Sequence, residues 1–337
     1  MQEHNTVVRV RRFGSADELE VARAPLPEPK RGEVRVRITA ASIEYTDVTI
    51  RKHLYPWVRK SPPFVMGYDF VGVIDRLGEG VTDFRLGDRV ADMTMVGSDA
   101  AYRTRKAHLL TRVPEKVDAA EAAAVILSWT TAHQLLHRSA RVRPGQRVLV
   151  HGAAGAVGQA LIVLGKKAGL DLWGTCRAKN ADLVRNLGAM PIDYQHEDFT
   201  QAVRGGFDVV FDGIGEDGFR RSLAALAPEG LLSFYGYSAG VQGGLGSGDI
   251  GMWMARLWLQ RFFPHGKRAR SYSINVMRAL HPAWFKEDLA RLFDMLEKGE
   301  IHPRVAERIS FDEVAEAHRR LEAGGLDGKL VLCPGLG

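Results

Sequence analysis

The chain has 337 residues, enough for two domains with separate cores, and its 45% hydrophobic and 26% charged residues are typical of a soluble globular protein. Two cysteines exclude a disulfide framework and a cysteine-rich zinc finger, and a net charge of +6 without a long Lys/Arg block gives no reason to expect a nucleic-acid partner. The first residues, MQEHNTVVRVRRFG, lack an apolar signal core and no stretch has the length of a membrane span, so we expect a cytoplasmic protein.

The first third of the chain predicts an antiparallel, barrel-like domain. It contains short runs of alternating or β-branched apolar residues, separated by glycines and prolines. These runs are Val7–Phe13, Glu33–Ile43, Phe64–Leu77, Asp88–Met95 and Ala101–Arg112. Such closely spaced strands are typical of a small β-barrel.

From Ala119 the pattern changes to a helix and then to alternating strands and helices. The expected elements after that helix are Arg147–Val150, Val157–Ala168, Leu172–Arg177, Ala181–Leu187, Pro191–Asp193, Asp208–Asp212, Phe219–Leu226 and Gly230–Tyr235. This alternation predicts βαβ units and a parallel sheet covered on both faces.

The last hundred residues begin with a glycine-rich segment and a compact apolar run at 252–263. We expect the run to be a helix that packs over the active site or at a dimer interface. A second hypothesis is contact with a membrane or an apolar substrate chain. Further expected elements are a strand at Arg270–Met277, helices at Trp284–Lys298 and Asp312–Ala323, and a final strand at Lys329–Leu332.

The segment Gln146–Gly169 predicts a dinucleotide site. A strand leads into three glycines and a helix follows at once, as a pyrophosphate requires. Gly152 allows a tight turn, Gly155 lets the backbone approach the phosphates, and Gly158 lets the helix press on the strand. The residues expected to bind the cofactor here are Gly152, Ala154, Gly155, Ala156, Val157 and Gly158.

The end of the second expected strand favours NADPH over NADH. An NAD site usually has a carboxylate there for the ribose diol, but this strand ends in Arg177, with Lys179 just beyond. A guanidinium can bind a 2′-phosphate with two hydrogen bonds, whereas a carboxylate would repel it. The alternative is that both residues are ordinary surface cations.

Several segments together resemble a known family. They are PFVMGYDFVGVIDRLGEGVTDFRLGDRV, PGQRVLVHGAAGAVGQ, FDVVFDGIGEDGF and GKLVL, in the family's order and spacing. They resemble the medium-chain dehydrogenase/reductase superfamily, specifically its zinc-free quinone oxidoreductase (zeta-crystallin-like) branch, and residues 238–278 resemble the vesicle amine transport protein sub-branch. The resemblance implies an α/β fold, with a GroES-like β-barrel catalytic domain at 1–120 and 279–337, a Rossmann doubly wound parallel sheet domain at 121–278, and a homodimer.

The resemblance also implies further cofactor contacts. Tyr194 matches a tyrosine that packs near the 2′-phosphate, and Thr131 matches a threonine near the nicotinamide. The residues that match the family's wrapping of the nicotinamide half are Gly213, Gly215, Gly236 and Tyr237.

No metal site is expected. Where zinc-dependent members have a cysteine and a histidine, this chain has Thr46 and Tyr68, and zinc needs soft or imidazole ligands. His133 and His137 are four residues apart on an expected helix, but without further ligands we interpret them as a pair on the helix surface.

Without a Lewis acid an alcohol is hard to oxidise, whereas quinones and activated alkenes accept hydride readily. The leading hypothesis is therefore a zinc-independent, NADPH-dependent reductase of quinones or α,β-unsaturated carbonyls. One alternative is an enoyl thioester (enoyl-CoA or enoyl-ACP) reductase. Another is a non-enzymatic nucleotide-binding protein that handles lipids or serves as an interaction module.

Candidate proton donors are Glu44, Tyr45 and Tyr55. Glu44 replaces the asparagine of the family motif, so it is either an acid with a raised pKa or a side chain turned outward. Tyr55 aligns with the proton donor of mitochondrial enoyl thioester reductases. The alternative for both tyrosines is an aromatic residue in the barrel wall. We expect Asp47 to be structural.

Overall fold

The computed structural model describes residues 4–215, 219–236 and 266–336, which form two compact units. One unit is Met1–Leu127 with Ala283–Gly337, and the other is Ser128–Pro282. The division falls after Leu127 rather than after residue 120 because helix α2 (Ala119–Ile126) contacts strands of the first unit. The predicted α/β fold is confirmed.

The first unit is built on a seven-stranded sheet in which β15, β16, β3, β5, β6 and β8 lie in that order, with β7 paired to β3. All pairs are antiparallel except β15 with β16. The strands are β3 (Glu33–Ile43), β5 (Asp69–Leu77), β6 (Arg89–Met93), β7 (Tyr102–Lys106), β8 (Thr111–Arg112), β15 (Val305–Ile309) and β16 (Lys329–Leu332). The eleven-residue strand β3 holds this sheet together, because it pairs with β5, β7 and β16.

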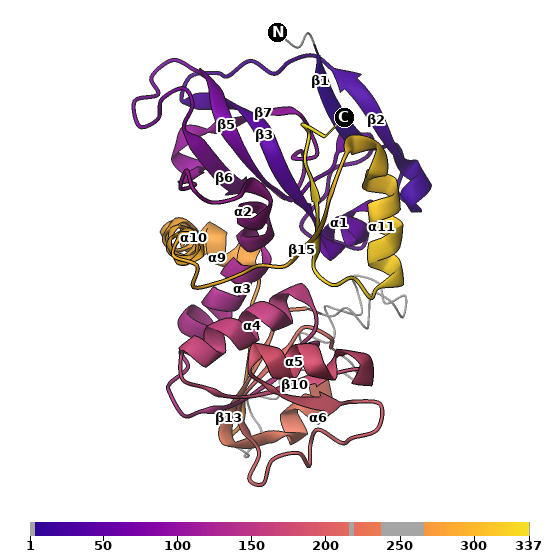
Figure 1. Cartoon of the computed structure of the whole chain (residues 1–337), viewed down its shortest axis with the longest axis vertical. Coiled ribbons are helices and arrows are strands. Elements are labelled where there is room, and N and C mark those ends of the chain that lie inside the picture. The colour runs from indigo at the N-terminus through magenta and orange to yellow at the C-terminus, as the bar shows by residue number, and fades with distance from the viewer. Residues whose placement is uncertain (1–3, 216–218, 237–265, 337) are drawn as a thin grey trace. The chain divides into compact units, whose positions relative to one another are not determined.

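A second, three-stranded sheet and several helices complete this unit. The sheet has the order β2, β1, β4, with β1 at Asn5–Val10, β2 at Leu19–Ala24 and β4 at Phe64–Val65. The helical elements are η1 (Ala16–Glu18), α1 (Tyr45–Arg51), η2 (Ala107–Leu109), α2, α10 (Pro282–Glu297), η7 (Phe311–Glu313) and α11 (Val314–Ala323). In Figure 1, α11 from the end of the chain lies beside α1 and β2 from its beginning.

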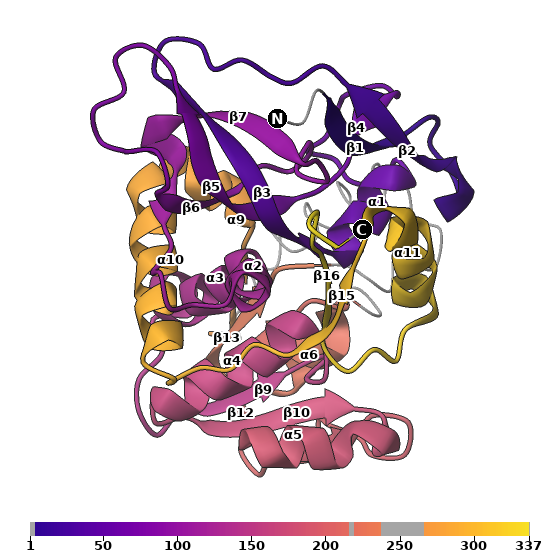
Figure 2. The ribbon, with the colours of Figure 1, turned by 45° about the horizontal axis from the view of Figure 1, so that its top comes forward.

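The second unit is a six-stranded parallel sheet with the order β11, β10, β9, β12, β13, β14. Its strands are β9 (Arg147–Val150), β10 (Asp171–Cys176), β11 (Met190–Asp193), β12 (Phe207–Asp212), β13 (Leu226–Phe234) and β14 (Arg268–Ser271). Its helical elements are α3 (Ser128–Gln134), η3 (Leu135–Ala140), α4 (Ala156–Lys167), η4 (Ala178–Asn180), α5 (Ala181–Leu187), α6 (Arg220–Ala224) and α9 (Ile274–Leu280). This strand order is that of doubly wound dinucleotide-binding sheets, and Figure 2 shows α4 and α5 against the sheet.

The structure differs from the sequence prediction in several elements. Helix α1 and strand β2 were not predicted, because each is short: capping by Glu44 and Asp47 begins α1, and β2 forms by pairing with β1. The predicted strand at Arg270–Met277 is wrong beyond Ser271, since pairing with β13 ends there and α9 begins three residues later. The β-branched Ile274 and Val276 favoured a strand locally, but a strand needs a partner.

Part of the prediction falls outside the described residues. This applies to Tyr237 and to the apolar run at 252–263, so the two hypotheses for that run stay predictions. Across the described residues, no helix combines the length and the apolar character that crossing a bilayer requires.

A buried arginine joins the two ends of the first unit. Arg51, on α1, is fully buried; its Nη1 donates to the Gly14 carbonyl at 2.5 Å and its Nη2 pairs with Glu322 of α11. Its Nε donates to Nδ1 of His318 at 3.4 Å. Burial, with the nearby guanidinium, lowers the pKa of His318 to about 3, so this ring is neutral and can accept the hydrogen bond.

Replacement of Arg51 by methionine should destabilise the protein, because the Gly14 carbonyl, the buried His318 ring and Glu322 would lose their common donor. We expect the free energy of unfolding in urea to fall by about 3 kcal/mol. The matched control is Arg319→Met, which removes an exposed pair with Asp17 and should cost less than about 1 kcal/mol. Equal losses in the two variants would contradict this account.

Candidate functional site

The predicted cofactor residues of the second unit gather at one edge of its parallel sheet. The glycine turn follows β9, Arg177 follows β10, Tyr194 follows β11, Gly213 follows β12 and Gly236 comes two residues after β13. The carboxyl ends of parallel strands share one edge, so five segments that are far apart in the sequence meet there. Ligands of doubly wound sheets bind at this edge.

The glycine turn brings the start of α4 into close contact with β9. Gly152 has φ +65°, which favours glycine, and a Cβ on Gly158 would lie 2.3 Å from the Gly152 carbonyl oxygen. Gly155 is the N-cap of α4 and provides no side chain to cap the helix. The first turn of α4 therefore presents backbone N–H groups that no N-cap side chain occupies, which is what an anion needs.

A buried hydrogen-bond network connects the segments at this edge of the sheet. His151 lies within hydrogen-bond distance of the hydroxyls of Thr175 (3.0 Å) and Ser222 (3.2 Å), and the Thr175 hydroxyl also accepts from the Gly152 N–H. Ser222 donates to Asp212 Oδ2 at 2.6 Å. The other oxygen, Asp212 Oδ1, accepts from the N–H groups of Ile214 and Gly215. The network thus connects the glycine turn to the turn after β12.

Arg177 and Tyr194 form a pair at the ends of neighbouring strands. The guanidinium Nε of Arg177 donates to the Tyr194 hydroxyl at 3.1 Å, and both side chains are exposed, as is Lys179. The register of β10 with β11 places the ends of these strands side by side. The structure therefore brings together two of the three residues expected near the 2′-phosphate, Arg177 from the strand end and Tyr194 from the resemblance.

The turns after β12 and β13 approach each other closely. A Cβ on Gly213 would lie 2.7 Å from the Tyr235 ring, and one on Gly236 would lie 2.7 Å from the Gly213 carbonyl oxygen. Burial, with the nearby Asp212 carboxylate, raises the pKa of Tyr235 well above its usual range, so this phenol stays protonated. Thr131 is buried on α3. Glycine at 213 and 236 is therefore what allows these two turns to pack against each other.

These features fit a pyridine nucleotide. The glycine turn and the open N-terminus of α4 would hold the pyrophosphate, because side chains are absent where the phosphates must approach. Arg177 and Tyr194 lie at the strand ends where the adenosine ribose of such a cofactor binds.

The first unit contains a buried cluster of polar residues at the end of β3. Ser42, Glu44, Asp69 and Lys329 are each at most 8% exposed. The Ser42 hydroxyl lies 2.7 and 2.8 Å from the two Asp69 carboxyl oxygens and 3.2 Å from Glu44 Oε1, and Lys329 of β16 donates to Glu44. Burial, together with the Glu44 charge, raises the pKa of Asp69 to about 8.

Glu44 and Asp47 cap the start of α1 reciprocally. The Glu44 N–H donates to Asp47 Oδ2 at 2.9 Å, which gives Asp47 the structural role expected of it. Burial raises the pKa of Asp47, and the charge of the neighbouring Asp99 raises it further. Burial also raises the pKa of Asp99, to about 7. The expectation that Glu44 might turn outward is wrong, since its side chain is buried against Lys329.

The two candidate tyrosines lie outside the barrel strands. Tyr45 is the first residue of α1, and Tyr55 lies in the segment between α1 and β4, so the barrel-wall alternative is wrong for both. The Tyr55 hydroxyl is 2.7 Å from that of Tyr68, and either can be the donor. Tyr68 is fully buried and directly precedes Asp69 in the sequence.

The structure corrects the interpretation of the two helix histidines. His133 is only 5% exposed, and its ring centroid lies 4.6 Å from that of His137, which is exposed. They are therefore not a pair of surface side chains. Within the described residues, no group of three or more histidine, cysteine, aspartate or glutamate side chains has the arrangement to hold a metal ion.

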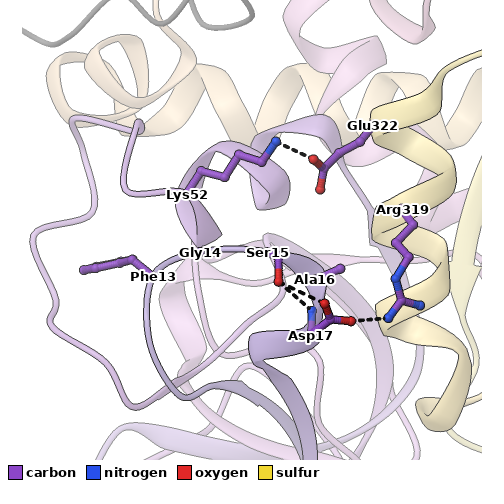
Figure 3. Close-up of a pocket in the computed structure, with 8 residues that line it drawn as sticks. All are labelled: Phe13, Gly14, Ser15, Ala16, Asp17, Lys52, Arg319 and Glu322. Carbon is purple, nitrogen blue, oxygen red and sulfur yellow. Dashed lines mark hydrogen bonds and ion pairs between the residues drawn. The ribbon is translucent and has the colours of Figure 1, made fainter.

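The first unit also has a surface pocket of about 650 Å³. Figure 3 shows that its charged residues face one another in pairs, Lys52 with Glu322 and Arg319 with Asp17. None of its lining residues is among the predicted site residues. Because the charges within it are already paired, the pocket has no evident role in the chemistry.

Sequence analysis missed the residues that support the two clusters. No sequence motif indicated a role for His151, Thr175 or Ser222. The available signal was the position of His151, between the end of β9 and the glycine turn. Asp69 and Lys329 appeared only within family segments, without a role. Their partners are distant in the sequence, so spacing alone could not reveal them.

Comparison with known proteins gives two family models. The alcohol dehydrogenase GroES-like domain model matches residues 30–114, and the zinc-binding dehydrogenase model matches residues 187–332.

Full-length relatives agree. A 2-haloacrylate reductase of a Burkholderia species is 30% identical and covers 96% of this chain and 98% of its own. A quinone oxidoreductase of Pseudomonas aeruginosa is 32% identical, with 96% and 97% covered. A synaptic vesicle membrane protein VAT-1 homolog of Danio rerio is 28% identical, over 95% of this chain and 68% of its own.

Among solved structures, the quinone oxidoreductase of Pseudomonas syringae pv. tomato superposes with a TM-score of 0.86 at 28% identity, covering 98% of this chain and all of that one. The glycine turn, the strand order and these matches lead to one conclusion. The chain belongs to the quinone oxidoreductase branch of the medium-chain dehydrogenase/reductase superfamily, and is an oxidoreductase that uses a pyridine nucleotide.

Proposed function

We propose that the protein is an NADPH-dependent, zinc-independent reductase of quinones or α,β-unsaturated carbonyl compounds. The single observation that carries the cofactor choice is the Arg177–Tyr194 pair at the ends of β10 and β11. The substrate class is supported by the relatives named quinone oxidoreductase and 2-haloacrylate reductase, whose names share reduction of an electron-poor unsaturated compound.

The preference for NADPH has a simple electrostatic basis. Two cations, Arg177 and Lys179, follow β10 within three residues, and both are exposed at the edge where the adenosine ribose binds. The Nε–H of Arg177 donates to the Tyr194 hydroxyl, and the two terminal guanidinium nitrogens can then donate to a phosphate.

Zinc independence is supported by the identity of the residues at the family's zinc positions. Tyr68 is fully buried and its hydroxyl is hydrogen-bonded to Tyr55, so it is committed to a phenol pair. Thr46, on α1, has no imidazole or thiolate to offer. The chemistry therefore relies on the reduced nicotinamide, which supplies a hydride when bound.

The protein's own part is to orient the acceptor and to provide a proton. The acceptor gains an electron pair with the hydride and then needs a proton at oxygen or at the α-carbon. Glu44 and Tyr55 are the candidate donors, since each is linked by hydrogen bonds to a second acidic or phenolic group.

Replacement of Arg177 by alanine should remove the preference for NADPH. We expect the KM for NADPH to rise about tenfold, equivalent to about 1.4 kcal/mol, while the KM for NADH changes little. The control is Arg143→Ala, since Arg143 is an exposed arginine before β9 at the opposite edge of the sheet. A wild-type enzyme that prefers NADH would refute the assignment.

The function itself is tested by following oxidation of NADPH with a panel of quinones, short enals and crotonyl-CoA. Turnover with quinones or enals is the expected result, because these acceptors need only hydride and a proton. Turnover with crotonyl-CoA alone would replace the proposal by enoyl thioester reduction. No turnover with any acceptor, under conditions in which NADPH raises the melting temperature, would overturn it.

Removal of metal should leave the activity intact. After dialysis against 1,10-phenanthroline, we expect the rate with the best acceptor to stay within about twofold of the untreated enzyme, because no zinc-bound oxygen takes part. A zinc-dependent alcohol dehydrogenase treated in parallel serves as the control. Loss of activity that added Zn²⁺ restores would contradict zinc independence.

A further inference from the structure

The Ser42 hydroxyl in the buried cluster is surrounded by more acceptors than it can serve. It lies 2.7 and 2.8 Å from the Asp69 oxygens, and 3.2 Å from both Glu44 Oε1 and the Ala123 carbonyl. A serine hydroxyl has one hydrogen to donate. If both carboxyls were ionised, this hydrogen would be shared between the two Asp69 oxygens, and Glu44 Oε1 would face the Ser42 oxygen at 3.2 Å with no hydrogen between them, deep in the protein. That contact is repulsive.

One additional proton on the cluster resolves the conflict. Asp69 Oδ1 already accepts from the Ser42 N–H at 3.0 Å, so the proton belongs on Oδ2. Protonated Oδ2 donates to the Ser42 oxygen, and the Ser42 hydrogen is then available to Glu44 Oε1. In the alternative arrangement the proton is on Glu44, and Ser42 donates to Asp69 instead.

We propose that Asp69 and Glu44 share one proton across the Ser42 hydroxyl, and that this pair supplies the proton that follows hydride addition. The proposal rests on the reductase function proposed above. Glu44 would be the delivering end, since it is the candidate donor, and Asp69 and Ser42 would be positioning residues that act through it.

The step balances in atoms and charge. Hydride addition leaves an electron pair on the acceptor oxygen, and the O–H bond of Glu44 breaks as a new O–H bond forms there. Glu44 becomes a carboxylate and is held by Lys329. The shared proton reaches Glu44 before this transfer, as Asp69 Oδ2 gives its hydrogen to the Ser42 oxygen and Ser42 gives its own hydrogen to Glu44. After the transfer both carboxyls are ionised, until a proton from solvent reloads the pair.

The neighbouring charges are consistent with a proton held at neutral pH. Burial is the largest cause of the raised pKa of Asp69, the Glu44 charge raises it further, and Lys329 opposes both. Asp47 and Asp99 also lie in this buried region and have raised pKa values of their own. The active form is the protonated one, so the rate should fall as the pH rises through about 8.

The stored proton can be tested by infrared spectroscopy of the whole protein in the absence of substrate. We expect the wild type at pH 6 to show the carbonyl band of a protonated carboxylic acid that Asp69→Asn lacks, and this band should disappear as the pH rises through about 8. Asp47 and Asp99 are present in both proteins, so the band of Asp69 is taken from the difference between the two spectra. The control is Asp92→Asn, because the buried Asp92 is paired with Arg105 outside the cluster and its replacement should leave the band in place.

Kinetics with an enal test the use of the proton. Both Asp69→Asn and Ser42→Ala should lower kcat about tenfold or more, with the KM for NADPH unchanged, and should flatten the alkaline limb of the pH profile. Ser42→Ala should keep the acid band, because it removes the connection and not the proton. Ser42→Thr, which restores a hydroxyl, should recover the rate.

The results separate this proposal from the function on which it rests. A wild-type protein without the band, or variants with the wild-type rate and pH profile, would overturn the shared proton as a source. If no acceptor is reduced, the proposed function fails and the role in turnover fails with it. The band then still shows whether the pair holds a proton.

Discussion

The contact between the glycine turn and the first residues of α4 is the constraint on which the cofactor half of the protein depends. Because a Cβ on Gly158 would lie 2.3 Å from the Gly152 carbonyl, the helix can reach the strand end only with glycine there. That approach aims the open N-terminus of α4 at the sheet edge where the other strands also end. The network from His151 to Asp212 then connects the glycine turn to the turn after β12.

The first unit depends on a different physical balance, the cost of burying polar and charged groups. A buried charge is tolerated when it is paired or neutralised. Arg51 meets this condition through a carbonyl, a neutral imidazole and Glu322, and Glu44 meets it through Lys329. Lys329 only partly offsets the burial of Asp69, and the pKa of Asp69 is raised to about 8. Burial of the Asp69 carboxyl in the cluster at the end of β3 therefore costs stability, and the same burial lets this carboxyl hold a proton.

Local patterns in the sequence were sufficient for the elements that repeat a simple rule. The ranges of β9 and α5 agree with the predicted ones, because β-branched runs before glycine and helix-favouring residues before Gly188 leave few alternatives. The predictions at Ile274–Met277 and at α1 were wrong or missing because pairing and capping decide those segments. Ser42 and Asp69 are 27 residues apart, and Glu44 and Lys329 are 285 apart, so no spacing rule could connect them.

The sequence by itself determined the family and the two kinds of domain, and it predicts the dinucleotide site, since the patterns that indicate them are short local runs of residues. The homodimer, the cytoplasmic location and the role of residues 252–263 stay predictions. Only the tertiary structure decided that Arg177 meets Tyr194, that Glu44 is buried against Lys329 and that Asp69 surrounds one hydroxyl with both its oxygens. The reason is physical: pKa values and hydrogen-bond partners depend on burial and on neighbours that folding brings from distant parts of the chain.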